Sequence, residues 1–161
     1  MTVPVIDLFA GPGGLPEGFE NYRHRGEKIF RCVLSVEKER FAHQTLLLRS
    51  FLRQFKRVQK EYYVHARGEL SLAKLYRMYP KQHRAARSEA IRLTLAWRNR
   101  SQIDMLVRDA LRTVDDNWLL IGGPPCQAYS IVGRARRLPE ERRALEKTRM
   151  HYLYKEYLFI W

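Results

Sequence analysis

The feature that most constrains the fold is a glycine-rich turn that lies between a short apolar run and a helix-forming segment. Residues 3–9 are mostly apolar and are typical of a buried strand. The turn Gly11–Gly14 comes next, and residues 15–22 are compatible with a short helix. Glycines allow a tight turn and let a ligand approach the main chain without a Cβ in its way. This order predicts the opening of an α/β domain.

Strand-like and helix-like segments then continue to alternate. Residues 29–36 have the pattern of a second strand, and residues 38–55 that of a helix with one apolar face. From Ile103 to Val114, apolar residues recur at the spacing of an amphipathic helix. Residues 118–121 form another short apolar run. Because helices separate the strands, the chain is predicted to have an α/β fold with a parallel sheet core.

The segment from about residue 57 to residue 100 interrupts this alternation. Two helical stretches, residues 71–79 and 85–97, follow each other on either side of Pro80, which predicts a helical insertion or an elongated crossover between two strands. Residues 21–100 hold 20 Lys and Arg against six Asp and Glu, in a chain whose net charge is +13. Such an excess favours a polyanionic partner, above all nucleic acid. A solvated helical face with the same composition is the alternative.

An acidic residue follows the second predicted strand at a distance typical of nucleotide-type sites. Glu37 stands 24 residues after Gly13, and in such folds an acid about 20 residues beyond the glycines binds ribose hydroxyls. The turn has neither the Lys-Ser/Thr pair of a P-loop nor a regular Gly-x-Gly-x-x-Gly pattern. We therefore predict a cofactor site whose ligand need not contain a pyrophosphate. The alternative is a plain strand-to-helix turn with Glu37 in solvent.

A cysteine in a proline- and glycine-rich loop is the second chemical feature. Cys126 follows Gly-Gly-Pro-Pro directly after the apolar run 118–121. Because the carboxyl ends of parallel strands share one edge of a sheet, we expect Cys126 to face the glycine turn. Cysteine thiolates are nucleophiles that nearby positive charge favours, and Arg134 is close in sequence. The alternative is a buried, unreactive cysteine, which is our interpretation of Cys32 inside the second strand.

Together, the two segments resemble those of a known family. Asp7-Leu-Phe-Ala-Gly-Pro-Gly-Gly14 resembles the first motif of the DNA (cytosine-5)-methyltransferases, and Gly123-Pro-Pro-Cys-Gln-Ala-Tyr-Ser130 resembles their Pro-Cys-Gln motif. The two motifs have the order seen in the family, and Glu37 stands where the family has its ribose-binding acid. The resemblance covers residues 3–39 and 118–134, whereas the segment 57–100 departs from it.

The resemblance implies an incomplete Rossmann-like fold and methyl transfer from S-adenosylmethionine to C5 of cytosine in double-stranded DNA. The Cys126 thiolate would add to C6 of a cytosine flipped out of the duplex and would leave again after C5 has lost its proton. No metal would be needed. The residues that would border the cofactor are Phe9, Gly11, Gly13, Gly14, Leu15, Glu37 and Pro125. Those that would lie near the DNA or the flipped base are Gln127, Ser130 and Arg134.

Several parts of the family pattern are absent from residues 1–161: a Glu-Asn-Val motif, a later arginine-rich motif, the target recognition region and the final segment. We therefore expect residues 1–161 to be the amino-terminal part of a bacterial modification methyltransferase that is inactive by itself. Its system could include a cognate restriction endonuclease. The alternative is a non-catalytic nucleic-acid-binding remnant of such an enzyme. Methylation of RNA cytosine is a weaker third hypothesis, because only one loop cysteine is present.

The sequence also predicts where such a protein would work. No apolar run approaches the roughly 20 residues that span a bilayer, and the first residues lack the pattern of a secretory signal. Two distant cysteines exclude a disulfide scaffold and fit a reducing compartment. We expect a cytoplasmic, nucleoid-associated protein without a membrane partner.

Overall fold

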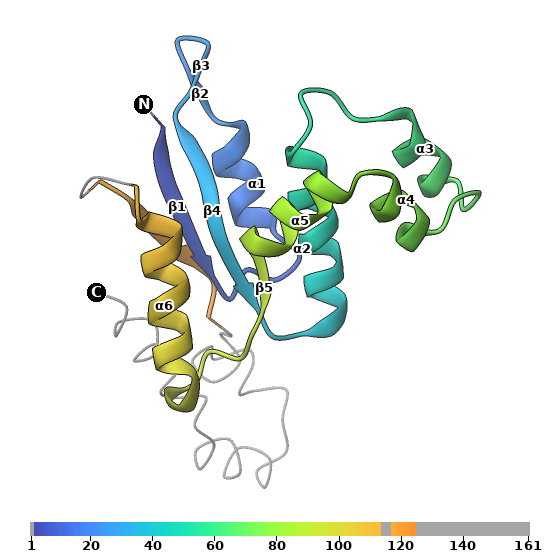
Figure 1. The fold of residues 1–161 in the computed structure, drawn as a ribbon. Coiled ribbons are helices and arrows are strands. Elements are labelled where there is room, and N and C mark those ends of the chain that lie inside the picture. Colours follow the sequence, from blue (N-terminus) through green and yellow to red (C-terminus); the bar gives the residue numbers. More distant parts are fainter. Residues whose placement is uncertain (1, 114–116, 125–161) are drawn as a thin grey trace, which may run out of the picture.

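The computed structural model describes residues 2–113 and 117–124, and its centre is a four-stranded parallel sheet with helices on both faces (Figure 1). The strand order is β5-β4-β1-β6. The strands are β1 (Val3–Leu8), β4 (Phe30–Glu37), β5 (Ala90–Arg92) and β6 (Leu119–Gly122). The chain moves outward from β1 to β4 and β5, and then returns to the other side of β1. The predicted α/β fold with a parallel sheet core is therefore confirmed.

The helices lie in two layers. One face of the sheet is covered by α6 (Arg100–Leu111), which follows the short 3-10 helix η1 (Trp97–Asn99). The other face carries α1 (Gly14–Asn21), α2 (Arg40–Arg53) and α5 (Pro80–Glu89). Beyond α2 lie α3 (Lys60–Ala66) and α4 (Leu72–Met78). A small hairpin of β2 (Arg23–His24) and β3 (Glu27–Lys28) joins α1 to β4.

The main core lies between the sheet and α6. Its buried side chains come from neighbouring central strands, from the segment after β5 and from one face of α6: Ile6, Leu8, Leu34, Val36, Leu95, Ile103 and Val107. Ile103 and Val107 stand four residues apart, so both project from the same side of the helix. Burial of each such side chain contributes about 1.5–3 kcal/mol. The amphipathic pattern predicted for this helix is confirmed.

A second apolar cluster attaches α4 and α5 to α2. Its centre is Phe51, whose ring meets those of Phe55 at 5.1 Å and Tyr76 at 5.0 Å between centroids, both edge to face. Leu75 and Ala86 complete the buried part of the cluster. Edge-to-face aromatic pairs contribute about 0.5–1.5 kcal/mol beyond their buried area. The helices α4 and α5 are therefore packed onto the domain, and α3 is joined to them where Tyr79 Oη donates to Glu61 at 2.7 Å.

One predicted element is wrong in its second half. The helix expected over residues 85–97 ends at Glu89, and Ala90–Arg92 form the edge strand β5, which pairs with Ser35–Glu37. The residues from Ile91 to Leu95 alternate apolar and polar, the period of a strand. The path from β4 to β5 is thus an elongated crossover that contains α2 to α5. That residues 57–100 are an insertion relative to other proteins stays a prediction.

The other predicted strands and helices are present, with ends that shift by a few residues. Pro80 is the first residue of α5, where its fixed φ and missing N–H are tolerated. No helix in the described ranges is both long and apolar enough to cross a membrane.

Candidate cofactor site

The candidate site lies where the parallel strands end at one edge of the sheet. The glycine turn follows β1, Glu37 ends β4, and Gly123 follows β6. The strand order reverses between β1 and β6, which is the position where open α/β sheets bind ligands. A cavity of about 210 Å³ opens at this edge. Its lining consists of Phe9, Gly11, Val36, Glu37, Lys38, Leu93, Thr94, Leu95 and Gly123.

The turn after β1 has an unusual backbone. Phe9 has a φ of 59° and Gly11 a φ of 55°, both in the left-handed region. For a residue with a bulky side chain this conformation costs about 1–3 kcal/mol and persists only where the surroundings impose it. Here Ala10 N–H donates to the Val36 carbonyl at 3.0 Å, which fixes the turn against β4. This hydrogen bond thereby keeps Phe9 and Gly11 at the wall of the cavity.

Glu37 ties the glycine turn to the end of β4. One carboxylate oxygen accepts a hydrogen bond from Gly11 N at 2.8 Å, and the other accepts one from Glu39 N at 2.7 Å. The side chain is 9% exposed and borders the cavity. A carboxylate can accept about four hydrogen bonds, so two acceptor positions are left for a ligand. The sequence pattern predicts Glu37 at the carboxyl-terminal edge of the sheet, and in the structure it lies there, beside the turn.

The remaining glycines of the turn have other surroundings. Gly13 precedes α1 with a φ of 85°, and a Cβ there would lie 2.9 Å from Leu46 Cδ1. Close packing of the turn on α2 therefore requires this glycine. Gly14 and Leu15 line a separate open depression on α1, which also contains Phe19 and Phe30. The predicted contacts of Gly13, Gly14 and Leu15 with a cofactor stay predictions.

Asp7, the first residue of the glycine motif, is completely buried. Neither carboxyl oxygen has a hydrogen-bond partner in the described part of the chain. Burial, and after it the charge of Glu37, raises the pKa of Asp7 to about 7. The motif thus contains a carboxyl group that changes protonation near neutral pH, in the last residues of β1 before the turn.

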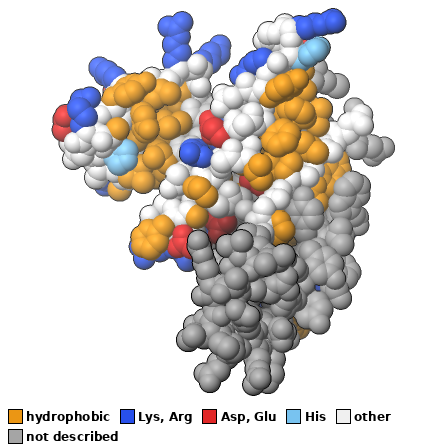
Figure 2. Space-filling model, turned by 180° about the vertical axis from the view of Figure 1, so that it is seen from behind, with side chains coloured by type: hydrophobic (Ala, Val, Ile, Leu, Met, Phe, Trp, Pro, Cys, Tyr) orange, Lys and Arg blue, Asp and Glu red, His pale blue; other side chains and the backbone are white. Residues whose placement is uncertain are grey.

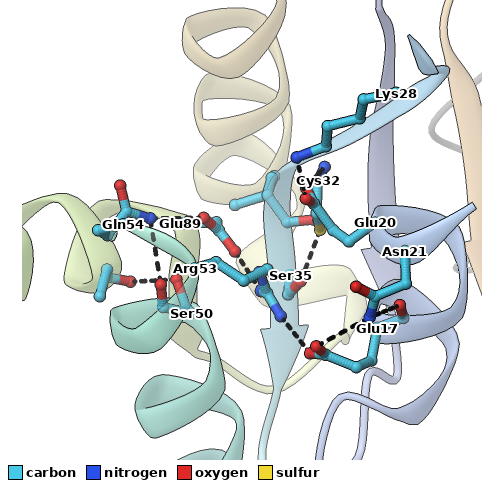
Figure 3. A network of polar contacts seen from close by, with 12 residues as sticks. Glu17, Glu20, Asn21, Lys28, Cys32, Ser35, Ser50, Arg53, Gln54 and Glu89 are labelled. Carbon is cyan, nitrogen blue, oxygen red and sulfur yellow. Dashed lines mark hydrogen bonds and ion pairs between the residues drawn. The ribbon is translucent and has the colours of Figure 1, made fainter. Parts of the chain in front are cut away.

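An ionic network supports the site from the α1, α2 and α5 side of the sheet (Figure 3). The Arg53 guanidinium donates to Glu17 of α1 at 3.0 Å and to Glu89 of α5. Gln54 also donates to Glu89, at 3.2 Å. Burial raises the pKa of Glu89, whereas the neighbouring Arg53 lowers it. Arg53 therefore joins the helix after the glycine turn to the helix that leads into β5.

Cys32 belongs to the same interior. It is 3% exposed, its Sγ lies 3.2 Å from Ser35 Oγ, and its backbone N–H donates to Glu20. Glu20 also pairs with Lys28. Burial raises the pKa of the Cys32 thiol to about 12. The interpretation of Cys32 as a buried core cysteine is confirmed, and its lack of reactivity stays a prediction.

The side of the cavity that follows β5 was not predicted from the sequence. Leu93, Thr94 and Leu95 line the cavity there, and Leu93 N–H donates to the Glu37 carbonyl at 3.1 Å. The apolar-polar alternation of this segment is the signal that could have found it. Five predicted site residues lie outside the described residues: Pro125, Cys126, Gln127, Ser130 and Arg134.

Comparison with known proteins finds a related methyltransferase. The chain is 31% identical to Type II methyltransferase M.Bpa9945I of Bacillus paralicheniformis over 175 aligned positions, which cover 95% of the chain and 36% of that methyltransferase. The chain thus spans about a third of the length of the curated relative it matches. No family model matches, and no solved structure matches. The parallel sheet and the glycine turn agree with a partial methyltransferase fold of the Rossmann-like type.

Proposed function

We propose that the chain is the cofactor-binding part of a DNA methyltransferase that transfers a methyl group from S-adenosylmethionine to C5 of cytosine. The observation that carries this proposal is the cavity at the carboxyl ends of the strands, bordered by the turn Phe9–Gly11 and by Glu37. The relationship to a type II methyltransferase over 95% of the chain supports it independently.

The residues at the cavity fit the nucleoside part of such a cofactor. Glu37 has two acceptor positions left for ribose hydroxyls, because its two main-chain partners occupy only half of its capacity. A Cβ at Gly11 would meet no protein atom within 4 Å, so the space beside this residue is open. Ligand pockets usually have about 300–1,000 Å³. The 210 Å³ present here accommodates part of the cofactor.

In this proposal the chain supplies binding groups and a nucleophile. S-adenosylmethionine, when bound, provides an electrophilic methyl group. Glu37 holds the ribose, Gly11 lets the ligand approach the main chain, and Pro125 borders the cofactor. Cys126 forms a bond to C6 of a flipped cytosine, and this bond breaks again when C5 has lost its proton. Gln127, Ser130 and Arg134 contact the DNA.

Cofactor binding is tested by isothermal titration calorimetry with S-adenosylmethionine. Glu37→Gln is expected to weaken binding about 10- to 100-fold, because hydrogen bonds to a charged group contribute about 1.5–3 kcal/mol. Glu61→Gln is the control: Glu61 lies on α3 and bonds to Tyr79, away from the cavity. Equal affinity of both variants, or no binding by the unchanged chain, would refute the cofactor site.

Methyl transfer is tested separately with a labelled methyl donor and cytosine-containing duplex DNA. In a protein that transfers the label, Cys126→Ser is expected to abolish transfer and to leave cofactor binding unchanged. Label on C5 in spite of the serine would exclude Cys126 as the nucleophile. Label on the exocyclic amine of cytosine or adenine would keep the methyltransferase and change its target atom.

A further inference from the structure

A basic groove lies between α4 and α5, away from the cofactor cavity. It is an open depression of about 820 Å³ with three arginines in its wall: Arg77 from α4, and Arg84 and Arg87 from α5. The other lining residues are Ala73, Tyr76, Pro80, His83 and Ser88. All three arginines are exposed. Figure 2, which views the molecule from behind, shows Lys and Arg side chains along the rim of the lobe built by α3 to α5.

The segment that builds this groove carries positive charge and no acidic residue. Residues 70–88 contain Lys74, Arg77, Lys81, Arg84 and Arg87 and no Asp or Glu. Within the described residues none of the three groove arginines pairs with a carboxylate, whereas Arg53 and Arg67 do. Like charges in one depression repel each other, and a solvated helical face would intersperse acids among them. An external anion would relieve this repulsion.

The floor of the groove is aromatic. The Tyr76 and His83 rings stack with 4.1 Å between centroids and 5° between planes. Tyr76 Oη is buried and has no hydrogen-bond partner among the described residues. Burial, together with the charge of Arg87, lowers the pKa of His83. The groove therefore presents charged, planar guanidinium groups around a neutral ring pair. Such guanidinium groups can bind the phosphates of a polyanion that lies on the protein surface.

The groove and the cofactor cavity lie at opposite ends of one strand. The helix α5 leads into the amino end of β5, and Leu93–Leu95 of the cavity follow the carboxyl end of that strand. Figure 1 shows α5 beside α2, α4 farther from the sheet, and the carboxyl ends of the strands at the lower edge. A polyanion in the groove would thus extend the contact surface beyond the cofactor edge.

We infer that Arg77, Arg84 and Arg87 form a second DNA-binding surface, which holds the phosphate backbone of duplex DNA outside the target base. The choice of duplex DNA rests on the proposed function. Each arginine neutralises one phosphate and releases the counterion of that phosphate. Three such contacts contribute about 2.7 to the slope of log affinity against log salt concentration, because each contributes about 0.9 on B-form DNA.

The experiment is fluorescence anisotropy of the full chain with a labelled 30-base-pair duplex of arbitrary sequence, from 50 to 200 mM salt. For the triple variant R77Q/R84Q/R87Q we expect the slope to fall by about 2.7 and the affinity at 100 mM salt to fall at least about tenfold. The variant R77K/R84K/R87K keeps the charges and should keep most of the slope. The control R25Q/R98Q/R108Q removes three exposed arginines elsewhere, and should reduce the slope by less than one.

Other outcomes overturn the inference. Equal losses in the groove triple variant and the control triple variant would mean that net charge alone binds DNA. Tighter, groove-dependent binding of single-stranded RNA, or of vesicles that contain phosphatidylserine, would assign the groove to another partner.

The two proposals fail independently. The groove variant is expected to bind S-adenosylmethionine like the unchanged chain, and Glu37→Gln is expected to bind DNA normally. Groove-dependent DNA binding by a chain that binds no S-adenosylmethionine would support the groove and refute the methyltransferase, in favour of a nucleic-acid-binding remnant.

Discussion

Replacing Arg53 by alanine is expected to destabilise the fold by about 3 kcal/mol. The side chains of Arg53 and Glu89 are 11% and 12% exposed, so the variant leaves a carboxylate inside the protein without its cation. Removal of one partner of a buried ion pair costs about 3–5 kcal/mol. The lower end applies here, because Gln54 still donates to Glu89.

The assay is urea unfolding followed by far-ultraviolet circular dichroism. With a denaturant dependence of about 2 kcal/mol per molar, the midpoint should fall by about 1.5 M. Arg67→Ala is the matched control: its partner Glu69 and Arg67 itself are both 57% exposed, and such pairs contribute at most about 1 kcal/mol. The double variant R53M/E89L should be more stable than R53A, because it removes the buried carboxylate of Glu89, whereas Glu17, which also loses its partner, is 38% exposed.

The loss should also depend on pH. Burial already raises the pKa of Glu89, and the removal of Arg53 raises it further. Protonation of Glu89 then removes the unpaired charge, so the difference between Arg53→Ala and the unchanged chain should shrink as the pH falls. A loss no larger than that of Arg67→Ala, or one that stays constant with pH, would refute the role of Arg53 as the buried link between α1 and α5.

Two further predictions concern the end of β1 and the turn that follows it. Because the folded-state pKa of Asp7 is about 7 against an ordinary value of 3.8, the native state binds more protons between these values. The free energy of unfolding should therefore fall by up to about 4 kcal/mol as the pH rises from 4 to 7. In denaturant unfolding, Asp7→Asn should remove this dependence on pH. An unchanged pH dependence would contradict the raised pKa of Asp7. Gly13→Ala should destabilise by about 1–3 kcal/mol, because its φ is 85° and its Cβ would lie 2.9 Å from Leu46 Cδ1. Gly14→Ala, whose Cβ would meet no atom within 4 Å, is the control, and equal thermal midpoints of the two variants would exclude the clash.

The elements that local pattern determines could be predicted. Short apolar runs indicated β1, β4 and β6, and the spacing of Ile103 and Val107 indicated α6. The strand β5 was missed because the alternation from Ile91 to Leu95 is short and directly follows a helical pattern. Its pairing with Ser35–Glu37 depends on contacts between distant parts of the chain. Its place at the edge of the sheet, beside β4, therefore comes from the tertiary structure.

The same division holds for the candidate site. The glycine turn and the distance from Gly13 to Glu37 are enough to predict that both lie at one edge of the sheet. The sequence could not show that Glu37 is bound by two main-chain N–H groups, that Gly13 is needed against Leu46, or that Thr94 borders the cavity.

By itself the sequence determined the alternation of strands and helices at the two ends of the described chain, the glycine turn, the acid after the second strand and the concentration of charge in the middle of the chain. These properties are local, because they depend on residue type and short-range spacing. Only the tertiary structure decided the strand order, the burial of Asp7, the link from Arg53 to Glu89 and the convergence of three arginines in one groove. The strand order, the burial of Asp7 and the ion pair depend on residues far apart in the chain, which the packing of the sheet and its helices brings together. The three arginines are close in sequence but share a groove only because α4 and α5 pack against each other.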